Sequence, residues 1–182
     1  MPRLGLLCLG DVELVVLEYL QTELQAIIQD IFEKIQIIDE VLGIPKKAYK
    51  VERRQYLSPL FMLAIRNYAE KQDFDRILGI TPVDLFVYEL NFVFGQAEFG
   101  PEAKAAVISL YRLFPEFYGQ GENTDLFLKR VLKEALHEIG HTLGLDHCTN
   151  NCIMIFSNSI LDTDVKPASF CEKCRGKLSK AI

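Results

Sequence analysis

The sequence lacks the features of several protein classes. It has no run of about 18 uncharged apolar residues, so no segment is expected to span a membrane. Basic residues are in deficit, because 20 Lys and Arg stand against 25 Asp and Glu, a net charge of −5. Nucleic-acid binding normally needs a basic excess. We therefore expect neither a nucleic-acid partner nor a membrane partner.

The N-terminal segment also lacks the pattern of a secretory signal. A short apolar run over residues 4–9 is followed by Asp11 and Glu13, not by a longer apolar stretch and a small-residue cleavage site. We therefore predict a cytoplasmic protein whose thiols stay reduced. Hydrophobic residues make up 49% of the 182 residues and charged residues 25%, which is the composition of a globular chain of about one domain.

Strand-like and helix-like patterns alternate over the first 144 residues. Strands are predicted over residues 4–9, 34–42, 76–80, 92–99 and 105–113, although the last of these segments also allows a helix. Helices are predicted over residues 12–32, 57–74 and 124–144. This alternation predicts an α/β fold, a mixed sheet with helices packed on it.

Histidine is scarce, which makes its placement informative. The only three histidines, His137, His141 and His147, fall within the segment HEIGHTLGLDH. On a helix, His137 and His141 project from one face about 6 Å apart, a spacing that suits two nitrogen ligands on a tetrahedral zinc ion. Gly144 lets the chain leave the helix, so that His147 can return as a third ligand. Three protein ligands leave one position for water, which is the catalytic pattern.

Glu138 lies next to this predicted zinc site. It is rotated about 100° from His137 on a helix, so its carboxylate lies beside the metal rather than on it. There it can take a proton from zinc-bound water and pass it to a leaving amine. Asp146 is the alternative third ligand, but the spacing from Gly144 favours His147. A polar helix end with solvated histidines is disfavoured, because no structural need gathers all three there.

The motif resembles a known family. HEIGHTLGLDH followed by a downstream methionine resembles the metzincin zinc peptidases, and the cysteines that follow it resemble those of the archaemetzincins. The resemblance covers residues 137–174. It implies a compact metzincin-like fold, a catalytic zinc, a second zinc held by four cysteines, and Met154 in a tight turn beneath the catalytic metal. Ordinary core packing is the alternative for Met154.

Four of the five cysteines form two close pairs, Cys148 with Cys152 and Cys171 with Cys174. Four thiolates suit a closed tetrahedral zinc site, which is structural because no position remains for water. Two disulfides, disfavoured in a reducing compartment, and reactive thiols are the alternatives. We expect two zinc ions per chain. A zinc-stapled C-terminal subdomain is expected over residues 145–182, beside a subdomain with the sheet and active-site helix over 1–144.

The substrate-binding strand is predicted from the resemblance. Metzincins bind an extended peptide antiparallel to an edge strand. The candidate is the segment with Phe92, Phe94 and Gly95, in which the glycine allows close approach. An interior strand packed by the two phenylalanines is the alternative.

The residues thus predict a monomeric zinc-dependent metallopeptidase that acts on a peptide or protein substrate. One alternative is a zinc-stabilised binding or regulatory protein without useful turnover, against which the intact Glu138 argues. Another is nucleic-acid binding through the cysteine module, which the acidic balance weakens. The natural substrate and the position of cleavage are left open.

Overall fold

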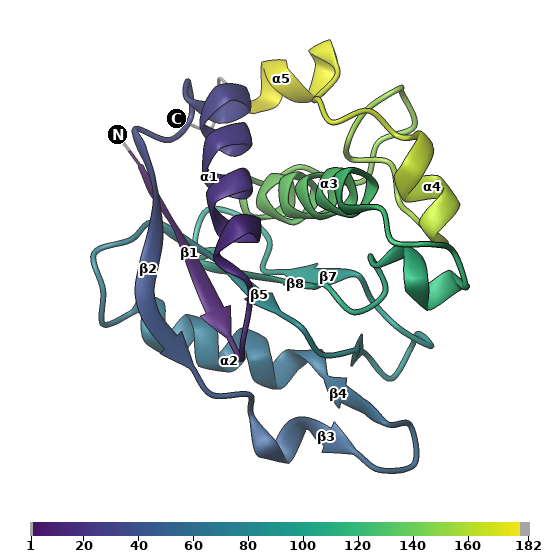
Figure 1. Cartoon of the computed structure of the whole chain (residues 1–182). Helices are drawn as coiled ribbons and strands as arrows, with labels where there is room; N and C mark the ends of the chain where they lie inside the picture. The colour runs from purple at the N-terminus through teal and green to yellow at the C-terminus, as the bar shows by residue number, and fades with distance from the viewer. Residues whose placement is uncertain (1, 179–182) are drawn as a thin grey trace.

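The sheet at the centre of the molecule separates two groups of helices (Figure 1). The computed structural model describes residues 2–178. The strands of the main sheet are β1 (Arg3–Leu9), β2 (Lys34–Leu42), β5 (Arg76–Thr81), β7 (Gly95–Ala97) and β8 (Ala105–Ser109). The helices are α1 (Leu14–Ile28), α2 (Ser58–Ala69), α3 (Thr124–Thr142), α4 (Ile160–Val165) and α5 (Glu172–Leu178). A second, small sheet joins β3 (Tyr49–Lys50), β4 (Gln55–Leu57) and β6 (Leu85–Phe86).

The main sheet has the order β2-β1-β5-β8-β7. Its first four strands are parallel, and β7 pairs antiparallel with β8 from Gly95↔Ile108 to Ala97↔Ala106. The parallel strands are almost continuously apolar and buried, as expected where helices cover both faces. Strand β7 is one edge of the sheet, opposite β2, and a further strand can pair with its outer side.

Side chains from the two faces of the sheet enter two different cores. Along β1, Leu4, Leu6 and Cys8 pack with α1 and α3, whereas Leu7 and Leu9 pack with α2. This alternation is the two-residue period of a strand. The larger core continues into the C-terminal segment, where Ile153, Met154 and Cys174 are buried in it.

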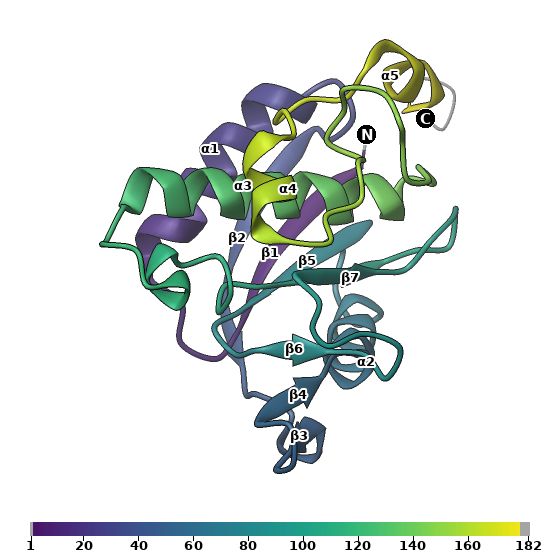
Figure 2. The same cartoon turned by 90° about the vertical axis from the view of Figure 1, so that its right-hand side faces the viewer.

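The C-terminal segment lies over one side of α3. Figure 2 shows β7 running below α3 and α4 lying in front of the same helix. No helix within residues 2–178 is long and apolar enough to cross a bilayer.

The predicted fold class is confirmed, with shorter elements than the sequence suggested. The strand predicted over 92–99 is regular only over Gly95–Ala97, and the strand predicted over 105–113 ends at Ser109. The small second sheet was not predicted, because strands of two or three residues carry no periodic pattern. The subdomain boundary after residue 144 stays a prediction, and residues 179–182 lie outside the described part of the chain.

Candidate active site

Helix α3 brings the first two histidines together with Glu138. It begins after Asn123, whose side-chain oxygen accepts a hydrogen bond from the Leu126 amide at 3.0 Å, as an N-cap residue should. Apolar residues on one face bury the helix against β8 and α1. The helix ends before Gly144, which has a φ of +83°, the left-handed conformation predicted for this position.

The three imidazoles converge on one point. One ring nitrogen of each of His137, His141 and His147 lies within 4.8 Å of those of the other two. The Nε2 atoms of His137 and His141 are 3.1 Å apart. We call these three residues the histidine cluster. Asp146, the alternative third ligand, is not part of it.

Hydrogen bonds on the opposite side of two rings fix their orientation. His137 Nδ1 lies 3.0 Å from the Ile153 carbonyl oxygen, and His141 Nδ1 lies 2.8 Å from that of Leu145. With the proton on Nδ1, each ring keeps the lone pair of Nε2 for a metal ion. Burial lowers the pKa of His137 to about 3 and also lowers the pKa of His141 and of His147. Neutral imidazole is the form that binds zinc, so this donor set fits the ion.

Glu138 is buried between α3 and the edge strand. A Cβ added to Gly95 of β7 would lie 2.7 Å from both Cγ and Oε1 of Glu138. Burial raises the pKa of Glu138 well above its usual value, and the nearby Glu134 carboxyl raises it further, while Lys166 lowers it. The absence of a side chain at Gly95 therefore lets the Glu138 carboxyl lie close to strand β7.

The predicted substrate-strand residues line one cavity with His137 and Glu138. The cavity has a volume of about 200 Å³, and we call it the histidine-side cavity. Its lining includes Phe92, Phe94 and Gly95. Phe94 is buried and its ring lies edge-to-face against that of Phe92, with the centroids 5.0 Å apart. The strand lies at an edge of the sheet and not in its interior, but the two phenylalanines do pack against the core, as the alternative expected.

Met154 lies beneath the helix that carries the histidines. It is fully buried, and a Cβ added to Gly140 of α3 would collide with its sulfur atom. The Ile155 amide donates a hydrogen bond to the Cys152 carbonyl oxygen at 3.2 Å, which closes a turn that contains Met154. The Cys148 amide donates to the Met154 carbonyl oxygen at 2.9 Å. The neighbouring Ile153 carbonyl is the one that orients His137.

The four C-terminal cysteines form a second cluster. Their sulfur atoms lie within 4.8 Å of one another, and all four thiols are free. The Cys148 and Cys171 sulfurs are 3.8 Å apart. A tetrahedral zinc ion with Zn–S bonds of about 2.3 Å requires sulfurs about 3.8 Å apart, whereas a disulfide requires about 2.05 Å. The Cys174 amide lowers the pKa of the Cys171 thiol to about 6, which favours a thiolate. This cysteine cluster fits the predicted structural zinc site.

A buried ion pair beside the histidines was not predicted from the sequence. Glu134 on α3 and Lys166 after α4 are each about 2% exposed, and Glu134 Oε1 lies 3.0 Å from Lys166 Nζ. Thr163 donates a hydrogen bond to the same oxygen at 3.0 Å. A glutamate on a helix and a lysine in a loop usually indicate solvated positions, so no sequence signal distinguished this pair.

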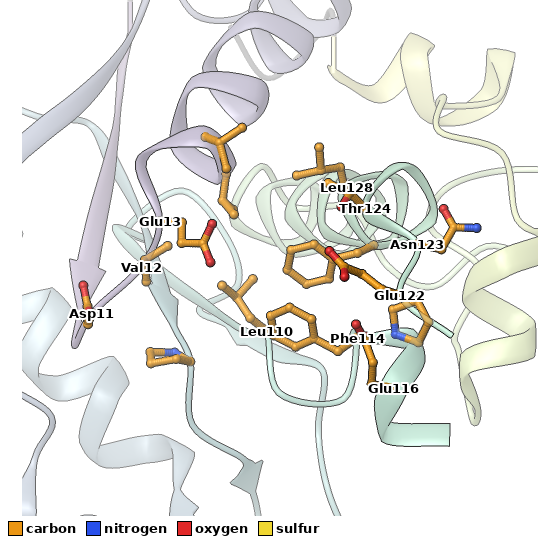
Figure 3. Close-up of a pocket in the computed structure, with 15 residues that line it drawn as sticks. Asp11, Val12, Glu13, Leu110, Phe114, Glu116, Glu122, Asn123, Thr124 and Leu128 are labelled. Atoms are coloured by element: carbon orange, nitrogen blue, oxygen red, sulfur yellow. The ribbon is translucent and has the colours of Figure 1, made fainter. Parts of the chain in front are cut away.

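A second cavity, shown in Figure 3, has a volume of about 200 Å³ and lies at the N-terminal end of α3, whereas His137 and His141 lie toward its C-terminal end. It is found where α1 and α3 begin, next to the ends of β1 and β8. Apolar side chains such as Leu110 and Phe114 line it together with carboxylates that include Glu13 and Glu122. Neither cluster contributes to its lining, so it is not the metal site.

The fold, the histidine cluster and the cysteine cluster together are typical of a zinc-dependent hydrolase. Residues 13–180 match the model of peptidase family M54. The chain belongs to this family of zinc metallopeptidases, the archaemetzincins, and the identity with an archaemetzincin from Pyrococcus abyssi is 43% over 96% of this chain and 93% of that protein. The predicted metallopeptidase activity is thereby confirmed, and the alternative of a binding or regulatory protein is not favoured.

Solved archaemetzincin structures share the fold. The structure from Archaeoglobus fulgidus, complexed with malonate, has a TM-score of 0.80 and 36% identity over 96% of this chain and 99% of that one. The structure from Methanopyrus kandleri has a TM-score of 0.84 and 33% identity over 99% of this chain and 94% of that one. These likenesses extend over both the sheet and the C-terminal segment.

Proposed function

We propose that this chain is a metzincin-type peptidase in which His137, His141 and His147 hold the catalytic zinc and Glu138 moves the proton. The observation that carries the proposal is the convergence of three ring nitrogens beside one buried carboxyl group. When zinc is bound there, it polarises the scissile carbonyl and lowers the pKa of a water molecule.

Glu138 acts as general base and then as general acid. A general base works best when its pKa lies near the working pH, and burial raises the pKa of Glu138 in that direction. The same carboxyl then returns the proton to the leaving amine, so no covalent intermediate is needed.

Strand β7 binds the peptide. Its outer side pairs with an extended substrate by adding a strand to the sheet. Gly95 keeps this edge close to Glu138, and Phe92 and Phe94 support the segment from which β7 begins.

The cysteine cluster holds a second, structural zinc, giving two zinc ions per chain. Cys148 follows His147 directly, and Cys152 lies two residues before Met154. The second metal thus fixes the chain on both sides of the Met154 turn and staples residues 145–182 as a small subdomain. The protein is proposed to be a cytoplasmic monomer without nucleic-acid or membrane partners. The unpaired cysteines favour a reducing compartment, and the negative net charge disfavours a nucleic-acid partner.

A peptide-library assay tests this function. The zinc-loaded protein is expected to cleave peptides, and a chelator to stop cleavage. Glu138→Gln should lower kcat/KM about 10²- to 10⁴-fold while the zinc content stays unchanged. The matched control is Glu122→Gln, which changes an exposed carboxyl in a loop far from the histidines. Hydrolysis by Glu138→Gln at the parental rate would refute the assignment.

A further inference from the structure

The histidine-side cavity is large enough for an aromatic ring. Its volume is about 200 Å³, more than the roughly 150 Å³ of an engineered cavity that binds benzene. Phe92, Phe94 and Phe156 contribute to its walls. Aromatic walls favour an aromatic guest, because ring pairs prefer edge-to-face or offset packing.

Two polar groups in the lining can bind a polar guest. Glu134 is 2% exposed, and both of its neighbours, Thr163 and Lys166, approach the same oxygen, Oε1. The hydroxyl oxygen of Ser157 is buried without a hydrogen-bond partner within residues 2–178. Both residues line the cavity, so a guest meets a buried carboxylate and an unpartnered hydroxyl there.

The charge balance favours a neutral guest over a cation. Lys166 lies 3.0 Å from Glu134 and already compensates its charge. The Lys166 ammonium is itself buried without a well-aligned hydrogen bond. A lysine or arginine from a substrate would have to lie close to this ammonium, and like charges repel strongly at low dielectric. A phenol avoids this cost, since its O–H donates to a carboxylate and its oxygen accepts from a hydroxyl.

We propose that this cavity receives the side chain of a tyrosine that follows the scissile bond of the substrate. The inference rests on the proposed function, because Glu138 lines the cavity and protonates the leaving amine. That amine belongs to the residue after the scissile bond, so the side chain of this residue lies next to Glu138. The Glu134–Lys166 pair and Ser157 then determine specificity rather than the chemical step.

The test compares two peptides, Tyr-Ala-Ala and Phe-Ala-Ala, which correspond to the fragment released after the scissile bond. Calorimetry on the zinc-loaded protein should show roughly 10- to 100-fold tighter binding of the tyrosine peptide, the effect of one hydrogen bond to a charged group. Equal affinities, or binding of neither peptide, would overturn the inference.

Variants assign the preference to the named residues. Replacing the pair by Glu134→Leu with Lys166→Met should bring the affinity ratio to one or below, and such apolar replacement of a buried pair is often tolerated. Ser157→Ala, a smaller change, should lower the ratio several-fold. The control is Arg130→Met with Asp164→Leu, an ion pair that joins the same two elements but does not line the cavity. An unchanged ratio in both cavity variants would contradict the inference.

Hydrolysis separates this inference from the proposed function. If the protein binds the tyrosine peptide preferentially but cleaves no member of a peptide library, the proposed function fails and the inference stands. If it cleaves library peptides equally before tyrosine and phenylalanine, the inference fails and the function stands.

Discussion

Gly95 is the residue at which the edge strand and the active-site helix come closest. It does not have a positive φ, so its role is spatial rather than conformational. Any side chain here would meet the Glu138 carboxyl on one side and the Val107 carbonyl oxygen on the other, both 2.7 Å from the added carbon. The position of Glu138, the proposed general base, therefore depends on the absence of a side chain at Gly95 of β7.

Gly95→Ala is expected to lower kcat/KM roughly 100-fold, because a displacement of about 1 Å at a reacting group costs about that much. Zinc content should stay at the parental value, since the atoms nearest to the added carbon belong to Glu138 and Val107 and not to a histidine. Parallel kinetic and metal assays check both. The control is Gly43→Ala, where an added carbon meets nothing within 4 Å. Parental activity in Gly95→Ala would show that Glu138 is not held in place by this contact.

The proposed zinc ligands and general base on α3 could be predicted from sequence because their spacing is local. His137, Glu138 and His141 share one helix, so a period of 3.6 residues places them without any knowledge of the fold. Glu134 and Lys166 could not be predicted, because they are 32 residues apart and meet only after α4 packs on α3.

At the scale of elements, polar side chains hold α4 against α3. Arg130 is 1% exposed and makes two hydrogen bonds to the Asp164 carboxylate, at 2.7 and 2.8 Å. It also donates to the Leu113 carbonyl at 3.1 Å, and Lys133 donates to the carbonyls of Thr163 and Asp164. These contacts fix the short helix α4 on α3.

Arg130→Met should reduce the free energy of unfolding by about 2–3 kcal/mol. Losing one partner of a fully buried pair costs about 3–5 kcal/mol, and the exposed fraction of Asp164, 25%, lessens the cost. Urea unfolding of the zinc-loaded protein measures this. Lys129→Met on the same helix removes an exposed pair with Asp125 and should leave the free energy of unfolding almost unchanged, because solvent screens such a pair. A similar loss in both variants would contradict a special role for Arg130.

Cys171→Ser is expected to remove one zinc ion per chain and to lower activity indirectly. The lost metal loosens the segment between His147 and Met154, and we expect a loss of about 10- to 100-fold, typical of changes in the groups that orient metal ligands. Metal analysis and kcat/KM are measured together. Cys8→Ala, in the core far from the cysteine cluster, should keep both zinc ions. Full activity with a native fold in Cys171→Ser would rule out the coupling.

At the scale of elements, the long periodic segments were predictable and the short ones were not. Helix α3 was placed within two residues, because both its N-cap and Gly144 have sequence signals. Strands β3, β4 and β6 depend on pairing with distant segments. The order of the main sheet likewise depends on long-range contacts, which no local pattern encodes.

The whole molecule consists of a parallel sheet that supports one long helix and a C-terminal segment that covers it. The sheet provides an edge strand, β7, beside the helix (Figure 2). The segment provides His147, Met154 and four cysteines. Because the same segment takes part in both clusters, its two proposed zinc ions are mechanically linked.

Zinc stoichiometry tests the central claim most directly. Atomic emission analysis of the purified protein should give two zinc ions per chain, and one ion per chain both in His141→Asn and in Cys174→Ser. His141→Asn should be inactive, whereas Cys174→Ser should retain part of the activity. A parent protein with one zinc or none, or a His141→Asn variant that keeps two zinc ions, would contradict the account.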